Sequence, residues 1–413
     1  MRAQRPSSPW RAAGIVVLIA VISALHAHRA GAQQAAKPLT LDDCIALGLA
    51  NQPAVVAANA SLAAAEDGYR ALQRMVLAQF FVRDLGIRKQ QACLGIEIAL
   101  AGVQQAEWET RYAITRNYYS VLYARKQLIV VNGIVDSLTD SAKKAKEFLD
   151  LGDPKIPITK IDVDTLVLNR DLVMTKVFEA QAGIDKAKAA LREAMGLKRE
   201  QAFDIAEGSL PALVENLDAK TLVDLALERR AELVQAHTAS TITQLEVAAQ
   251  GKTFRRQVKT FASGADLHAR PIPTGEANGD YRPGAIGLEM PPMLAGRKGD
   301  RIARAYSLSV RAGAVVDKTE NLIVLEAEAT FLKWREAAAK MKVLKNAPAL
   351  AKGIADNVQK RFFDKKASPE ELLRTQTQVS QTQAQYNEAE YQHALALAAL
   401  ERVTAGGFLI AKR

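Results

Sequence analysis

The side chains that most often carry chemistry are few in this sequence and lie far apart from one another. The histidines beyond the N-terminal segment are His237, His268 and His393, and none has a second His or Cys at metal-ligand spacing. Cys44 and Cys93 form no CxxC motif, so they supply neither a zinc site nor a disulfide framework. The two thiols could pair after export, but a buried free thiol is the favoured interpretation. The sequence therefore predicts no enzyme, no cofactor and no metal site.

The composition favours long helices over an ordinary globular core. Of the 413 residues 49% are apolar but only 6% are aromatic, and small aliphatic residues dominate. The 55 Lys and Arg exceed the 45 Asp and Glu, yet no dense basic stripe with interleaved aromatics stands out, which argues against nucleic acid as a partner. Only one long apolar run occurs, which excludes a membrane protein with many spanning helices.

The N-terminal segment has the pattern of an export signal. Arg2, Arg5 and Arg11 precede an apolar run over 12–27, and the small residues Ala30-Gly31-Ala32 follow. This order is typical of a signal peptide, which we assign to 1–32, although an uncleaved anchor is the alternative. We therefore expect the remainder of the chain to be exported.

The first half of the exported chain, 33–207, predicts a long helical hairpin. A short helix from Asp42 or Asp43 to Ala50 is broken at Pro53, and a second helix is expected to run to about Val82. After an irregular stretch over 83–95, a long helix continues to about Asp150, and a turn over 151–162 reverses the chain. The returning helix ends at Met195, and its apolar seam has the 3.5-residue period of a coiled coil at Val173, Val177, Ala180, Ile184, Ala187 and Leu191.

The second half, 208–413, repeats this plan. The segment 222–236 resembles the segment near residue 45 at an offset of about 178 residues. An insertion over about 255–300 contains five prolines and two strand candidates, 258–271 and 281–294. One long helix is then expected over 301–363, with a return helix that opens at Pro369 and carries His393 as a packed polar residue of its seam. The predicted fold is mainly α, with two coiled-coil hairpins in one chain and a small β-hairpin region.

Three segments resemble the outer-membrane efflux proteins of the TolC type. They are LTLDDCIALGLANQPAVVAANASLAAAEDGYRA from residue 39, RNYYSVLYARKQLIV from residue 116 and RFFDKKASPEELLRTQTQ from residue 361. The resemblance implies a homotrimer in which the hairpins form a periplasmic α-barrel and the strands a shared β-barrel in outer-membrane lipid. It further implies a passive duct for efflux or type I secretion, with a periplasmic adaptor protein and an inner-membrane pump as partners.

The same resemblance assigns roles to residues at the two ends of the hairpins. The aperture residues it implies at the tips are Asp153, Asp364, Glu370, Glu371 and Arg374. The implied adaptor-docking turns contain Gly152, Pro154, Pro157, Lys365, Lys366 and Ser368. The implied membrane-side strands contain Phe261, Leu267, Ile286 and Leu288. For Glu370 and Glu371 the alternative is a purely structural role, because acidic residues stabilise the first turn of a helix.

Two departures separate this sequence from the family pattern. At the tips, the second turn of the family usually has Gly where Lys365 or Lys366 stands, and Arg374 occupies what looks like an acidic place. The other departure concerns the strands. The segment 83–95 is too short for two membrane-spanning strands of about 9–11 residues each. Three protomers with one strand pair each would give six strands, whereas known outer-membrane barrels begin at about eight. The alternative function is therefore a non-conducting periplasmic scaffold or adaptor. The basic cluster at Arg297, Lys298, Arg301 and Arg304 is either a contact for lipid phosphates or a solvated face.

Overall fold

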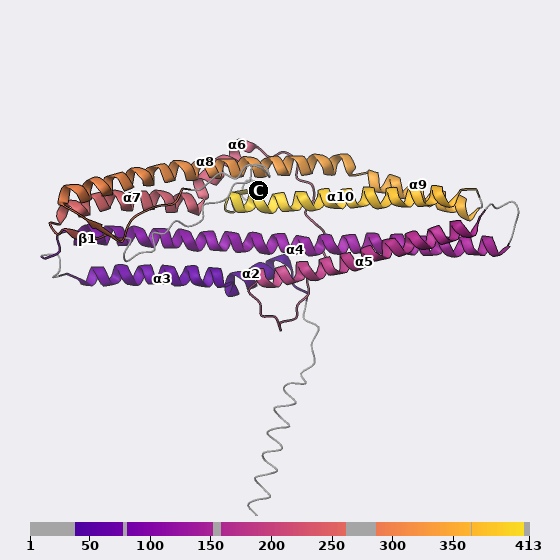
Figure 1. Ribbon diagram of the computed structural model, residues 1–413, viewed down its shortest axis with the longest axis horizontal. Helices are drawn as coiled ribbons and strands as arrows, with labels where there is room; N and C mark the ends of the chain where they lie inside the picture. Colours follow the sequence, from indigo (N-terminus) through magenta and orange to yellow (C-terminus); the bar gives the residue numbers. More distant parts are fainter. Residues whose placement is uncertain (1–37, 77–80, 152–157, 262–285, 365, 409–413) are drawn as a thin grey trace, which may run out of the picture.

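The computed structural model describes residues 38–76, 81–151, 158–261, 286–364 and 366–408. The predicted signal peptide lies outside these residues. The described helices run side by side along one long axis and form an elongated layer (Figure 1). No single described helix has the length and apolar character to cross a membrane. The helices Leu41–Asn51 and Pro53–Arg74, which meet at a bend of 46°, are together long and apolar enough to do so, by length and composition only.

The described part of the first half contains four helices, α2 (Leu41–Asn51), α3 (Pro53–Arg74), α4 (Leu85–Leu151) and α5 (Lys160–Ala194). Thr40 and Asp43 form a reciprocal capping box at the start of α2, and Thr159 forms another with Asp162 at the start of α5. Helix α4 has 67 residues, which corresponds to a length of about 100 Å. The predicted turn between α4 and α5 is therefore far from α2 and α3.

The predicted boundaries between the second and third helices were wrong. Helix α3 ends at Arg74 rather than near Val82, and most of the segment 83–95 belongs to the first turns of α4. The charge of Arg88 is neutralised within the structure, because Arg88 pairs with Asp84 at 3.0 Å and with a buried glutamate of another helix.

The second half repeats the order of the first with α6 (Ala219–Arg229), α7 (Ala231–Lys252), α8 (Lys298–Leu344), α9 (Ala347–Phe363) and α10 (Pro369–Val403). Each bound of α6 and α7 is the corresponding bound of α2 and α3 plus 178, as the sequence offset predicted. Helices α5 and α10 have 35 residues each. The offset rises between α7 and α8, where the insertion was expected.

The predicted continuous helix over 301–363 is interrupted. Helix α8 ends at Leu344 and α9 begins at Ala347, with Pro348 in its first turn. Proline has no N–H for the carbonyl four residues earlier and its ring crowds that carbonyl, so the regular hydrogen-bond pattern stops at Leu344.

The described part of the insertion contains two short strands, β1 (Gln257–Lys259) and β2 (Met293–Ala295). They pair antiparallel with Val258 opposite Leu294, and these two side chains face the interior. Phe261, Ile286 and Leu288 were expected in strands, but all three lie outside β1 and β2, and Leu267 lies outside the described residues. Pro291 and Pro292 precede β2 and cannot donate to a strand ladder.

The helices have a fixed order across the layer. Helices α3 and α5 pack on α4, α4 packs on α7 and α10, and these two pack on α8 and α9 (Figure 1). Helix α4 and the pair α7 and α10 therefore have neighbours on both flanks. The outer flanks of α3 with α5 and of α8 with α9 are the two edges of the layer.

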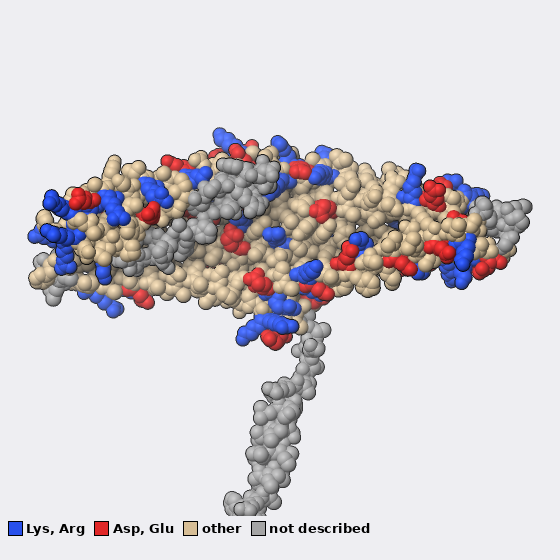
Figure 2. Space-filling view, viewed as in Figure 1, with Lys and Arg blue, Asp and Glu red and all other residues tan. Residues whose placement is uncertain are grey.

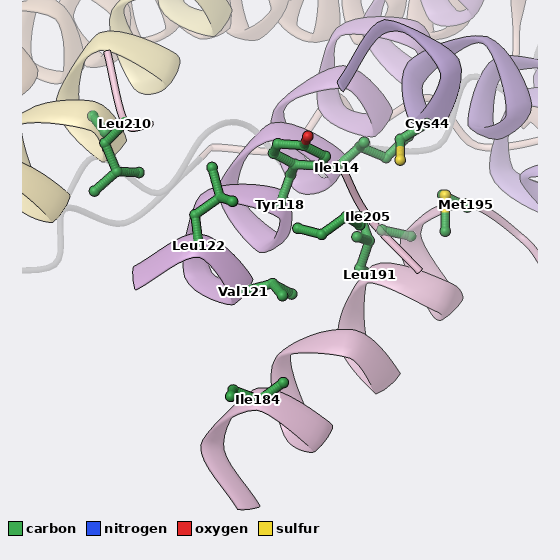
Figure 3. Packing of buried hydrophobic residues seen from close by; sticks show 12 residues of the cluster. Cys44, Ile114, Tyr118, Val121, Leu122, Ile184, Leu191, Met195, Ile205 and Leu210 are labelled. Carbon is green, nitrogen blue, oxygen red and sulfur yellow. The ribbon is translucent and has the colours of Figure 1, made fainter. Parts of the chain in front are cut away.

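The largest apolar cluster lies near the middle of the layer, where α2 and the end of α5 pack on α4 (Figure 3). Cys44 is fully buried in it, together with Ile114 and Leu191. Cys93 is exposed, and both thiols are free, so the considered disulfide is excluded. Since Cys93 precedes Ile114 by 21 residues of α4, the two cysteines lie roughly 30 Å apart.

Candidate functional site

At the end of the layer where the hairpins turn, the structure describes six of the predicted site residues: Asp364, Lys366, Ser368, Glu370, Glu371 and Arg374. Ser368 caps α10 by accepting a hydrogen bond from the Glu371 backbone N–H at 3.1 Å, and Pro369 opens the helix. Asp364 and Lys366 are exposed on the turn between α9 and α10. The other predicted turn residues, Gly152, Asp153, Pro154, Pro157 and Lys365, lie outside the described residues.

The two predicted aperture glutamates differ in their surroundings. Glu371 forms an ion pair of 3.2 Å with Arg361, which also donates to the Lys366 carbonyl at 3.3 Å. Its carboxylate therefore stabilises the turn. Glu370 and Arg374 are exposed and form no ion pair with any other described residue. One unpaired anion and one unpaired cation thus lie close together in the first two turns of α10.

Both hairpin ends belong to one packed unit. Phe362 of α9, Leu372 of α10 and Leu166 of α5 are fully buried in one apolar cluster that also contains residues of α4. The rings of Phe148 and Phe362 meet edge to face, with centroids 6.1 Å apart. Because this cluster joins the two hairpins of one copy, the end of α4, the start of α5 and the turn between α9 and α10 lie at the same end of the molecule.

A buried charge network lies near the middle of the layer, and the sequence analysis did not predict it. Arg230 at the start of α7 bonds Glu326 of α8 at 2.8 Å and Glu232 at 2.7 Å. Arg402 of α10 bonds the same Glu326 and also Glu109 of α4, at 2.7 Å. Burial alone would raise the pKa of Glu326, but the two guanidinium groups hold it below its ordinary value. The network joins α4, α7, α8 and α10.

A second buried network lies near the strands, and it too was not predicted. Arg88 of α4 forms two hydrogen bonds, of 2.5 and 3.0 Å, to the carboxylate of Glu246 on α7. Burial favours the neutral form of Glu246, yet Arg88 lowers its pKa below the ordinary value. Arg301 of α8 is fully buried and donates to Gln250 Oε1 at 2.9 Å and to the Thr253 carbonyl at 2.8 Å, at the end of α7.

A weak sequence signal for the central network existed in the duplication. Arg230 stands 178 residues after Gln52, and both precede the longer helix of their pair with nearly the same extended backbone. Gln52 donates to the carbonyls of Glu193 and Ala194, each at 3.2 Å. An arginine at this position, where the first half has glutamine, predicts carboxylate partners. The sequence does not show which carboxylates these are, because their positions depend on tertiary packing. No comparable signal marks Glu246, which lies in an apolar helix.

A groove of about 1380 Å³ runs over α10 between α4 and α8. Small residues such as Ala384 and Ala399 form its floor, and Tyr112 and Tyr123 contribute to its α4 side. The positively charged residues of its lining are Arg116, Lys333, Lys340 and Arg402, and the negatively charged ones are Glu326, Glu336 and Glu388. The two signs nearly cancel, so the groove has no strong charge preference, and its lining is more apolar than polar.

Two of the three histidines considered have structural partners, and His268 lies outside the described residues. His393 is buried, and its Nε2 accepts a hydrogen bond from the Val214 N–H at 3.3 Å, in agreement with the packed role predicted for it. His237 lies at the surface, 3.5 Å from Glu320. Among the described residues, no three His, Cys, Asp or Glu side chains converge in a way that could hold a metal ion.

Comparison with solved structures identifies the architecture. The outer-membrane channel OprN superposes with a TM-score of 0.68 over 89% of this chain and 90% of its own, at 15% identity. The outer membrane protein VceC from Vibrio cholerae gives 0.66 over 89% and 96% at 16% identity. The open state of the Neisseria gonorrhoeae MtrE outer membrane channel gives 0.60 over 89% of both chains at 13% identity. No protein-family model and no curated protein sequence matches this chain.

These matches show that the chain has the fold of TolC-type outer-membrane channels, so the predicted mainly α, duplicated-hairpin fold is confirmed. Identities of this size bear on the fold alone. Function has to be argued from the surfaces of this chain.

Proposed function

We propose that three copies of this chain close into a ring and that the ring is a passive duct of an efflux or type I secretion system. The observation that supports the proposal is the exposure of apolar side chains on the two outer edges of the layer. Each edge exposes apolar side chains near the hairpin tips, and within one copy no described helix covers them.

The two exposed stripes have the same spacing. On α5 they include Ile161, Leu168 and Leu172, and on α8 and α9 they include Val343, Leu350 and Ile354. Each stripe has a step of seven residues followed by a step of four, which is the spacing of a coiled-coil seam. The exposed fractions of Leu172 and Leu350 are 58% and 68%, far above what buried seam residues show.

We expect the α5 stripe of one copy to pack against the α8 and α9 stripe of a neighbouring copy, and neither stripe to pack against its own equivalent. They lie on opposite edges, so contact between α5 of one copy and α9 of the next is heterologous, and such contacts close into a ring when the rotation allows it. Burying one Leu, Ile or Val side chain stabilises an interface by about 1.5–3 kcal/mol. Three such interfaces would account for the apolar residues at both edges.

A duct requires no chemical step, which fits a groove over α10 whose charged lining residues nearly balance. We infer no enzymatic activity, an outer-membrane location with a periplasmic extension, and transport that is driven by partners. We assign the docking of a periplasmic adaptor protein to the hairpin tips, where Lys366, Ser368 and Glu370 are exposed. An inner-membrane pump would then supply both energy and substrate choice.

The test combines the mass of the detergent-solubilised complex with cysteine crosslinking across the proposed interface. In a background without Cys44 and Cys93, the pair Leu172→Cys and Leu350→Cys is expected to give covalent dimers and trimers on oxidation. Either substitution alone serves as the matched control and gives none, because a heterologous contact does not place a residue opposite itself. A monomeric mass together with no crosslinked ladder would overturn the proposal.

The scaffold alternative has one observation in its favour. Strands β1 and β2 have three residues each within the described part of the chain. Conductance in planar bilayers separates the two functions, because a trimer without conductance supports a scaffold and a conducting trimer supports the duct.

A further inference from the structure

The end of the layer opposite the hairpin tips is strongly basic. Its exposed or half-buried cations lie at the end of α7, on β1, at the start of α8 and just before α4, and we call them the basic end: Arg83, Lys252, Arg255, Arg256, Lys259, Arg297, Lys298 and Arg304. Figure 2 shows Lys and Arg gathered there with few Asp and Glu.

We propose that the basic end docks on the surface of an anionic lipid bilayer, with its cations against the headgroup phosphates. The inference deepens the proposed function, on which it rests for placing this end of the molecule beside a membrane. It assigns that contact to side chains of the helical layer itself.

The cations of the basic end have no anionic partners among the described residues. The acidic side chains nearby are engaged elsewhere, since Arg88 binds both Asp84 and Glu246. Asp300 accepts a hydrogen bond from the Arg297 backbone N–H at 2.9 Å and caps α8. A surface of like charges destabilises itself unless an external anion balances it.

Exposed apolar side chains accompany these cations. Phe81 is 87% exposed and Phe254 is 72% exposed, and Val76 and Met293 are exposed at the same end. The Arg83 guanidinium lies 5.4 Å from the centre of the Phe254 ring, and the Lys298 ammonium lies 4.8 Å from it. An aromatic ring between two cations matches the membrane interface, where rings lie among headgroups and cations meet phosphates.

Other occupants fit this surface less well. Helix α7 packs between α4 and α8, so the segment that follows it, with Phe254, Arg255 and Arg256, begins at the end of the layer and not on either edge. A second copy would bring the same positive charge to this face and would be repelled. A small soluble anion would leave Phe81 and Phe254 in water.

The hairpin-tip end provides an internal comparison because its charges are mixed. The exposed residues there include Lys143, Lys146 and Glu147 near the end of α4, and Arg361, Glu370 and Arg374 on the second hairpin. The variant Lys143→Glu/Lys146→Glu therefore changes the total charge as much as Arg255→Glu/Arg256→Glu does, but at the other end of the molecule.

Flotation of the mature chain with preformed vesicles tests the proposal. The wild type is expected to bind mixed phosphatidylcholine and phosphatidylglycerol vesicles, to bind phosphatidylcholine alone weakly, and to be released by salt. Arg255→Glu/Arg256→Glu should lower the partition coefficient at least about thirtyfold, since each cation near an anionic surface contributes about one factor of five. Lys143→Glu/Lys146→Glu should change it little, and Phe254→Ser should weaken binding to the mixed vesicles without removing its salt dependence.

Equal binding of the wild type to both kinds of vesicle would overturn the proposal, as would equal loss in the two double charge variants. The mass of the detergent-solubilised complex is measured on the same preparations. A trimer that ignores vesicle charge refutes the docking surface and leaves the duct, whereas a monomer that binds anionic vesicles refutes the ring and leaves the docking surface.

Discussion

The central charge network makes a quantitative prediction about stability. Glu326 is the only carboxylate that bonds both Arg230 and Arg402 in the described structure, and its side chain is 11% exposed. In the variant Glu326→Gln these two guanidinium groups, 3% and 16% exposed, lose their shared anion while they stay buried. Breaking a buried ion pair by removing one partner costs about 3–5 kcal/mol.

The lower part of that range applies here, because each arginine keeps a second carboxylate. Arg230 retains Glu232 and Arg402 retains Glu109. We therefore expect Glu326→Gln to reduce the free energy of unfolding by about 3 kcal/mol, measured by urea denaturation at constant protein concentration. The double variant Glu326→Gln/Arg402→Gln should cost less than the sum of its single variants by at least about 1 kcal/mol.

The matched control is Glu371→Gln at the hairpin tip. There the ion pair with Arg361 is solvent-exposed, at 41% and 54% for the two side chains, so its loss should cost at most about 1 kcal/mol. The reasoning is refuted if Glu326→Gln is no more destabilising than Glu371→Gln, or if the two network variants are additive.

Three further predictions concern pH, thiol reactivity and a glycine. Glu246 and Glu326 have pKa values lowered below their ordinary 4.5, so the stability that they contribute is fully present above that pH and is lost as the pH falls below it. Urea midpoints should fall steeply in this acidic range for the wild type and less steeply for Glu246→Gln/Glu326→Gln. Burial raises the pKa of Cys44 to about 11, whereas Cys93 is exposed, so native protein should take up one maleimide per chain and denatured protein two. Gly196 has φ +65° and an added Cβ would meet a backbone oxygen at 2.6 Å, so Gly196→Ala should lower the free energy of unfolding by about 1–3 kcal/mol.

Each of these predictions has a control in the same chain. An equally steep acid loss in wild type and double variant would show that other carboxylates control the acid response. Labelling of Cys44 in the native state, detected in a Cys93→Ser background, would contradict its burial. Gly133 lies in α4 with nothing near an added Cβ, so Gly133→Ala should stabilise the protein by up to about 1 kcal/mol and separate helix propensity from strain.

Much of the fold could be predicted from local signals. The break at Pro53 and the cap and proline at Ser368 and Pro369 mark helix boundaries in the sequence and in the structure. The first helix was expected to begin at Asp42 or Asp43, whereas its N-cap is Thr40 and Asp43 completes the capping box. The duplication added a second, independent constraint, because helices in one half predict those in the other. These features depend on neighbouring residues, and neighbouring residues are what a sequence displays.

The errors came from features that depend on distant residues or on an overlooked proline. The start of α4 was missed because the contact that fixes its first turns, between Arg88 and Glu246 of another helix, is not visible in the local sequence. The break after Leu344 had a local signal in Pro348, which the prediction of one helix over 301–363 did not take into account. At the candidate site, the turn residues could be located from sequence, but the ion pair of Glu371 with Arg361 and both buried networks required the packing of several helices.

The two hairpins of the chain are mechanically unlike each other. Helix α4 is continuous over its 67 residues, whereas its counterpart in the second half is divided between Leu344 and Ala347. In a ring of three copies, the continuous α4 helices and the divided α8 and α9 helices would alternate around the circumference. Bending at the tip end would then concentrate at the three equivalent breaks between α8 and α9, while the three continuous α4 helices would set the length of the cylinder.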